Sequence, residues 1–261
     1  MLVVRLPGGQ MFGHQVVRVS DAIWCLRRPS YLTCSYAVRM GDGVVLVDAG
    51  MDSHGADVQA LLRAMGAAEE SVRAILLTHW HNDHAAGARA IQRLCRCPVY
   101  YHAHEAPWLS RRTARVGLRG WLAKRIPEWG IGVLFIGLLG EAVPEAVAAT
   151  EYVRDGQVIV GAFEVIETPG HTVGHVSYYY RPERALFAGD ALAVIDGRVR
   201  FMARPVTMDL AQARASMERC LAREIAILCP GHREPLTEQV AQRCDEMRRY
   251  LAAGGPWPLF G

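Results

Sequence analysis

The chain has little that would direct it to a membrane, an oxidising compartment or a nucleic acid. Its first residues carry neither the charged segment nor the long apolar core of a secretory signal. The formal net charge is only +3, too small an excess to favour a polyanionic partner. The seven cysteines have no paired framework, which favours reduced thiols. We therefore expect a cytoplasmic protein that does not bind nucleic acid.

The remaining composition is that of an ordinary globular protein. Of 261 residues, 51% are apolar and 21% are charged, and a chain of this length can bury a large core as one domain. Short apolar runs alternate with helical patterns, which indicates an α/β fold in a single domain, 1–261. Strands are expected at 36–39, 44–48, 74–78, 99–102, 158–167, 176–180, 185–188 and 225–229. Helices are expected at 54–65, 84–94, 209–223 and 237–252.

One stretch, at about 108–149, breaks this alternation. It is first basic, from Arg111 to Arg125, and then strongly apolar from Ile131 to Leu139. The apolar part is too short for a bilayer, which needs about 20 residues. A lid or a dimer-interface helix pair is the favoured interpretation, and the second of these would make the protein a homodimer. The alternatives are peripheral membrane contact through a basic amphipathic helix and a groove for an acidic polymer.

Four side chains able to bind a transition metal stand within six residues, in His79-Trp80-His81-Asn82-Asp83-His84. They directly follow the apolar run 74–77, which predicts a buried strand that ends in a ligand-rich loop. In an extended loop His79 and His81 point the same way and can clamp one cation, whereas Asp83 and His84 suit a second. Imidazole nitrogen and carboxylate oxygen bind Zn²⁺, and also Fe or Mn. The sequence therefore predicts a metal site here.

These residues complete the H-x-H-x-D-H pattern, and the chain resembles the metallo-β-lactamase-fold hydrolases, in particular the glyoxalase II and lactonase-like branch. Four further pieces follow the family's order: Asp48 in Leu-Val-Asp-Ala-Gly, His171 in Thr-Pro-Gly-His-Thr, Asp190 in Phe-Ala-Gly-Asp and His232 in Cys-Pro-Gly-His. The likeness runs from 48 to 232. It implies a four-layer αββα sandwich, with 108–149 placed where related enzymes insert a substrate-covering segment.

The resemblance also implies how the ligands are shared between two divalent metal ions, most simply zinc, with manganese or iron as alternatives. The first ion is held by His79, His81 and His171. The second is held by Asp83, His84 and His232. Asp190 bridges both, and a hydroxide shared by the two ions attacks the substrate.

Other residues near this set receive supporting roles or none. Asp48 is expected to orient a ligand histidine through its ring N–H, and Asp83 to act additionally as a proton shuttle. His175 is expected to be a packed or hydrogen-bonded neighbour. His102 and His104 are left outside the ligand set.

Differences from known branches of this family reduce the number of reaction classes that we expect. Secreted β-lactamases carry a cysteine where this chain has Asp190, and acyl-homoserine lactonases place a tyrosine where it has Ala193. Glyoxalase II shares the ligands but adds a helical C-terminal domain, whereas only residues 233–261 follow His232 here. We predict a dinuclear hydrolase of a small-molecule lactone, thioester or small ester. The alternatives are a mononuclear iron oxidoreductase acting on thiols or persulfides, a phosphodiesterase of the same fold, and a non-catalytic or membrane-associated module.

Overall fold

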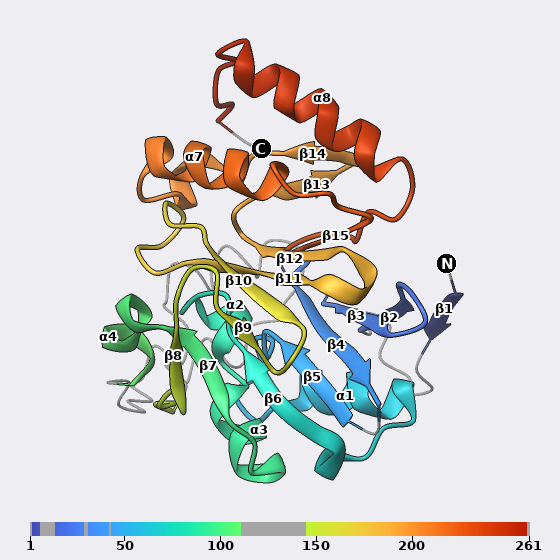
Figure 1. The fold of residues 1–261 in the computed structure, drawn as a ribbon. Helices are drawn as coiled ribbons and strands as arrows, with labels where there is room; N and C mark the ends of the chain where they lie inside the picture. The colour runs from blue at the N-terminus through green and yellow to red at the C-terminus, as the bar shows by residue number, and fades with distance from the viewer. Residues whose placement is uncertain (1, 6–13, 29–30, 42, 111–144, 260–261) are drawn as a thin grey trace. The chain divides into compact units, whose positions relative to one another are not determined.

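The computed structural model describes residues 2–5, 14–28, 31–41, 43–110 and 145–259 (Figure 1). The chain divides into two compact units. The first unit is Met1–Val99 with Ala106–Thr150, and the second unit is Tyr100–Glu105 with Glu151–Gly261. Residues 111–144 of the predicted insertion, including its apolar segment, lie outside the described residues. Within the described part, no helix is both long and apolar enough to cross a membrane.

The first unit is built on six strands that neighbour one another in sequence order. They are β1 Leu2–Arg5, β2 Gln15–Arg18, β3 Ile23–Arg27, β4 Cys34–Met40, β5 Gly43–Val47 and β6 Val72–Leu76. Pairing is antiparallel from β1 to β5 and becomes parallel between β5 and β6. Every residue of β5 is buried, as expected of an apolar strand covered on both faces. β4 and β5 pair as an antiparallel hairpin, in agreement with the strands predicted at 36–39 and 44–48.

The helices of the first unit are α1 Ala56–Met65, α2 Asn82–Ala85, α3 Ala88–Cys95 and α4 Ala106–Leu109. The prediction of one helix over 84–94 is wrong, because α2 and α3 are separate. The His84 carbonyl accepts a hydrogen bond from the backbone N–H of Ala49 at 2.7 Å, so the end of β5 occupies an acceptor that a continuous helix would use. At the break, a Cβ on Gly87 would lie 2.4 Å from the Ala49 carbonyl oxygen, which only glycine avoids.

The second unit holds a five-stranded sheet, a two-stranded sheet and, apart from Val99, one further pair of strands. The sheet order is β15 Ile227–Pro230, β12 Ala185–Gly189, β11 Val176–Tyr180, β10 Phe163–Glu167 and β9 Val158–Ile159. The pairs are β7 Val99–His102 with β8 Glu151–Val153, and β13 Ala193–Ile195 with β14 Arg198–Arg200. The predicted strand over 158–167 is interrupted, because Val160 and Gly161 have positive φ angles of 46° and 73° that an extended strand does not allow.

Helices α7 Leu210–Leu221 and α8 Val240–Ala252 cover this sheet's core. One cluster of buried side chains joins them to the strands, with Ile166 of β10, Leu186 of β12 and Leu228 of β15 meeting helix residues such as Met217 and Leu251. Figure 1 shows α7 and α8 on one side of these strands, beside the β13–β14 hairpin. The core fixes the strands whose ends carry three of the predicted ligands.

Candidate metal centre

The four predicted ligands of the first unit lie close together. The chain leaves β6, stays extended through His81 (φ −55°, ψ 145°) and begins α2 at Asn82. The His79 ring lies 4.7 Å from the His81 ring and 4.4 Å from the His84 ring, between centroids. The Asp83 carboxylate lies 3.6 Å from His84 Nε2. All four belong to groups of side chains that could hold a metal ion.

Asp48 and Thr78 set the orientation of two of these rings. Asp48 Oδ2 lies 2.9 Å from His84 Nδ1, while Asp48 Oδ1 accepts from the Thr78 backbone N–H at 2.9 Å. Thr78 Oγ1 lies 3.0 Å from His79 Nδ1. With both Nδ1 atoms engaged, Nε2 is the nitrogen of each ring that would bind a metal. The predicted hydrogen bond from Asp48 to a candidate ligand histidine is confirmed.

The loop that follows Asp48 is held by a buried carboxylate that sequence reasoning missed. Asp57 accepts from the backbone N–H groups of Met51 and Asp52 at 2.8 and 3.0 Å and pairs with Arg28 at 2.9 Å. Burial alone would raise the pKa of Asp57, but the hydrogen bond with His14 and the Arg28 charge lower it to about 2. In sequence, Asp57 resembles any acidic residue in a first helical turn.

The three predicted ligands of the second unit follow strands that run in one direction. β10 and β12 are both antiparallel to β11, and β15 is parallel to β12. The carboxyl ends of β10, β12 and β15 therefore meet one edge of the sheet. His171 follows β10, Asp190 follows β12 and His232 follows β15. The sheet topology therefore brings together residues that are up to 61 positions apart in the sequence.

One carboxylate oxygen stands between two imidazoles. Asp190 Oδ2 lies 3.3 Å from His171 Nε2 and 3.3 Å from His232 Nε2. Two atoms bound to one Zn²⁺ at about 2.1 Å with tetrahedral angles lie about 3.4 Å apart. His171 and Asp190 are almost fully buried, and all three residues belong to candidate metal-binding groups. Nitrogen and oxygen donors at this spacing fit a divalent transition metal.

Tight turns and a buried glutamate hold the His171 loop. Gly170 has a φ of 132°, and a Cβ there would lie 2.3 Å from the Ala213 backbone nitrogen, so the turn before His171 requires glycine. Glu105, fully buried, accepts from Thr172 Oγ1 at 3.0 Å and from the Gly174 N–H at 2.7 Å. No spacing or motif marks Glu105 in the sequence.

His102 and His104 line a cavity of about 650 Å³ in the second unit, together with Glu167 and His175. His102 Nε2 lies 3.3 Å from Glu167 Oε1. Burial lowers the pKa of His102, although the Glu167 charge opposes the shift. Neither His102 nor His104 joins a candidate metal-binding group among the described residues.

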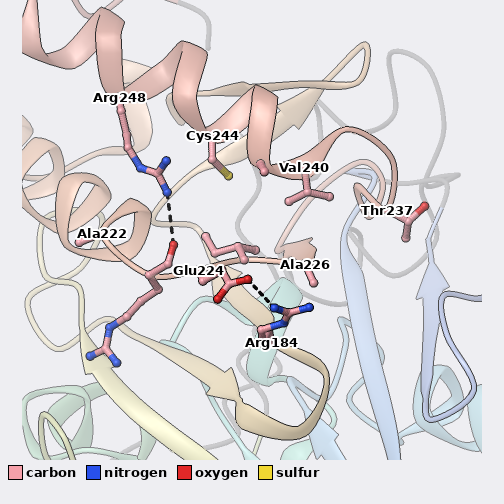
Figure 2. A pocket seen from close by; sticks show the side chains of 11 residues that line it. Arg184, Ala222, Glu224, Ala226, Thr237, Val240, Cys244 and Arg248 are labelled. Atoms are coloured by element: carbon pink, nitrogen blue, oxygen red, sulfur yellow. Dashed lines mark hydrogen bonds and ion pairs between the residues drawn. The ribbon is translucent and has the colours of Figure 1, made fainter.

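A second cavity of this unit, about 530 Å³, lies between α8 and the chain around Glu224 (Figure 2). Its guanidinium groups are committed to protein partners, since Arg184 pairs with Glu224 and Arg248 donates to the Arg223 carbonyl. Burial raises the pKa of the Cys244 thiol to about 11, so this thiol stays protonated at neutral pH. No disulfide joins the seven cysteines, all of which are described.

Comparison with known proteins places this centre in a family. The family model for the metallo-beta-lactamase superfamily matches residues 32–232. The probable metallo-hydrolase YflN of Bacillus subtilis is 33% identical over 162 residues, 58% of this chain and 56% of its own length. A hydroxyacylglutathione hydrolase of Nitrobacter winogradskyi is 27% identical over 239 residues, 86% of this chain and 77% of that protein.

Solved structures agree on the fold. The BLEG-1 B3 metallo-beta-lactamase has a TM-score of 0.62 at 24% identity, covering 85% of this chain and 97% of that one. TTHA1623 in a di-iron-bound form has a TM-score of 0.59 at 25% identity, covering 84% and 97%. The predicted α/β metallo-β-lactamase fold is confirmed. Because the matched region spans well over half of the chain and contains every candidate ligand, the chain belongs to the metallo-beta-lactamase superfamily.

Proposed function

We propose that this protein is a hydrolase that uses two divalent metal ions to cleave an ester-like bond. The observation that carries the proposal is the Asp190 carboxylate. One of its oxygens lies 3.3 Å from His171 Nε2 and 3.3 Å from His232 Nε2, which in each pair is the spacing of two donors around one cation. His79, His81 and His171 would hold the first ion. Asp83, His84 and His232 would hold the second, with Asp190 between them.

The protein's own groups prepare this site for hydrolysis. When bound, two such ions supply an activated water near neutral pH and polarise a carbonyl or phosphoryl oxygen. Asp48 and Thr78 keep the His84 and His79 rings aimed, so that metal binding does not have to order them. Asp83 Oδ2 accepts from Thr33 Oγ1 at 3.3 Å, which restrains the carboxylate that would also move a proton.

A pair of indoles supports an apolar substrate. Trp80 and Trp108 stack with ring centroids 5.6 Å apart and an interplanar angle of 13°. Trp80 also meets the His81 ring edge-on at 4.4 Å, and both indoles are half-buried. An acyl chain or aromatic group on the substrate would gain from packing against this surface. A lactone, thioester or small ester with an apolar acyl part fits these requirements.

The names of relatives support the same chemistry. Several similar proteins are named as metallo-hydrolases or hydroxyacylglutathione hydrolases, and the latter name describes an acylated thiol, which is a thioester. Since the match covers 56% of the first of these relatives, their activity comes to this chain as part of the proposal. A homodimer, peripheral membrane contact and a cytoplasmic location stay predictions.

The test measures both the metal content of the protein and its hydrolysis of candidate substrates. Protein purified without added metal is assayed for zinc, manganese and iron per chain, then offered lactones, thioesters, small esters and a phosphodiester. Two metal ions per chain and hydrolysis of an ester-like substrate are expected. One iron per chain with oxygen uptake on a persulfide would replace the proposal by an oxidoreductase. Cleavage of the phosphodiester alone would make the chain a phosphodiesterase.

A further inference from the structure

A buried chain of hydrogen bonds runs behind Asp190. The backbone N–H of Asp190 donates to His175 Nε2 at 2.9 Å. On the other side of the same ring, His175 Nδ1 lies 2.8 Å from Thr168 Oγ1. Both Thr168 and His175 are buried, and the prediction that His175 is a hydrogen-bonded neighbour of the site is confirmed. The His175 ring therefore contacts the candidate ligand Asp190 through the backbone of Asp190.

The chain continues from Thr168 into the sheet. Thr168 Oγ1 lies 3.1 Å from Ser177 Oγ, and Ser177 Oγ donates to the Ala188 carbonyl at 3.0 Å. Ala188 belongs to β12, the strand that ends just before Asp190. The bonds therefore form a closed path that leaves the backbone at Asp190 and returns to it two residues earlier.

The partners fix the direction of every proton on this path. A backbone N–H only donates, so His175 Nε2 must accept, and the proton of a neutral imidazole is then on Nδ1. That Nδ1–H donates to Thr168 Oγ1. The Ser177 hydroxyl proton is committed to a carbonyl, so the Thr168 hydroxyl donates to Ser177 Oγ. The opposite tautomer would set two N–H groups against each other.

The backbone at Asp190 needs such an anchor. Gly189, directly before it, has a positive φ of 50°, and the β12–β15 register shifts between Phe187 and Gly189. A glycine at a strand irregularity leaves the next residue free to turn unless another bond fixes it. The bond to His175 supplies that restraint, and it acts on the residue whose oxygen faces both His171 and His232.

We propose that His175 is a positioning residue for the Asp190 carboxylate. Its Nδ1–H tautomer, imposed by Thr168 and Ser177, holds the Asp190 backbone N–H and with it the direction in which the carboxylate meets the two histidines. The proposal rests on the proposed function in one respect, that Asp190 binds metal. The tautomer itself requires no metal.

The first experiment therefore uses the metal-free wild-type protein. Long-range ¹H–¹⁵N correlation spectra report which imidazole nitrogen carries the proton, and the His175 signals are assigned by their loss in His175→Gln. A proton on Nδ1 is expected. A proton on Nε2 would overturn the proposal whether or not the protein binds metal or hydrolyses esters.

The second experiment measures metal dissociation constants by chelator competition and the absorption spectrum of the cobalt-loaded protein. Thr168→Val removes the hydroxyl at nearly constant volume, whereas Thr168→Ser keeps it. A loss of affinity of about 10-fold or more is expected for the valine variant and much less for the serine variant, by analogy with other residues that support metal ligands. His175→Leu should lose at least as much, and His175→Gln should lose less because its amide oxygen can accept from Asp190.

His102→Gln is the matched control, since His102 is a half-buried histidine of the same unit and lies outside the path. It should leave affinity and spectrum unchanged. Equal affinities and spectra for folded Thr168→Val and Thr168→Ser proteins would overturn the proposal. A wild-type protein that binds no metal would instead overturn the proposed function, while the spectra of the metal-free protein still decide the tautomer.

Discussion

The two units carry their candidate ligands in different ways. The first unit has four within six residues, on one loop and one helical turn. The second unit has three, spread from 171 to 232 and placed at the ends of β10, β12 and β15. In the first unit the geometry follows from local backbone conformation. In the second unit the geometry depends on sheet topology and on turns. There a single residue, Asp190, contacts both of the other candidate ligands.

Replacing Asp190 should therefore produce the largest effect. In Asp190→Ala the oxygen that faces His171 and His232 is lost, and both proposed metal sites lose a ligand. We expect metal content to fall and kcat/KM on the best ester substrate to drop about 10³-fold, since several kcal/mol of transition-state stabilisation are involved. Circular dichroism should show an intact fold. Full activity in this variant would refute the ligand assignment.

Replacing Asp48 in the first unit should reduce metal affinity less than replacing Asp190, because Asp48 contacts the histidine His84 and would not bind the metal itself. Asp48→Asn keeps the shape but weakens the bond to His84 Nδ1. Metal affinity should fall about 10- to 100-fold, measured by chelator competition. Asp52→Asn is the control, since the Asp52 carboxylate accepts from the backbone N–H groups of His54 and Ala56. Equal affinities in the two variants would remove Asp48 from the site.

The difference between local geometry in the first unit and sheet topology in the second also determines how much of the site the sequence could predict. The compact motif at 79–84 and the strands at 99–102 and 176–180 depend on nearby residues, whereas the role of Asp48 is implied by the family resemblance, and the structure agrees with these predictions. The His175 path could not be predicted. The β10–β11 register pairs Ile166 with Ser177. Continued by two residues, this register places Thr168 opposite His175. The sequence of either strand alone does not determine the register between them.

Two other differences arise from partners that are distant in sequence. The interruption at Gly87 arises because Ala49, nearly forty positions earlier, takes the His84 carbonyl. Glu105 holds the His171 loop from a segment that is distant in sequence. The first strands, β1 to β3, are short and carry arginines, so their apolar alternation is weak. At Gly87 and at Glu105, a partner that is distant in sequence determines the local outcome.

Asp57, which anchors the loop of the first unit, should lose its stabilising charge in acid. Asp57 has its pKa lowered to about 2 from an ordinary value near 3.8, so its charge stabilises the fold fully above about pH 3.8 and stops doing so as the pH falls through about 2. The shift corresponds to about 2 kcal/mol. Asp57→Asn should lose about this much free energy of unfolding at pH 7, and less as the pH falls towards 2, in urea titrations.

Glu105→Gln is the counterpart in the second unit. Glutamine keeps an oxygen for Thr172 and Gly174, which are neutral donors, so the loss should be only about 1 kcal/mol. A loss at Glu105 that exceeds the loss at Asp57 would mean that charge pairing is not what distinguishes the two anchors.

The smallest effect is expected at the indole pair, which belongs to the first unit alone and contacts substrate rather than metal in our proposal. Trp108→Ala removes half of the stack on Trp80 while leaving the residue next to His81 in place. For an ester with a long acyl chain, KM should rise about threefold with little change in kcat, because the lost contact is apolar and present before the reaction. For the matched acetyl ester, KM should stay nearly constant. If both esters lose equally, the indoles support the loop at 79–84 and do not select the acyl group; metal affinity of the same variant then measures that support.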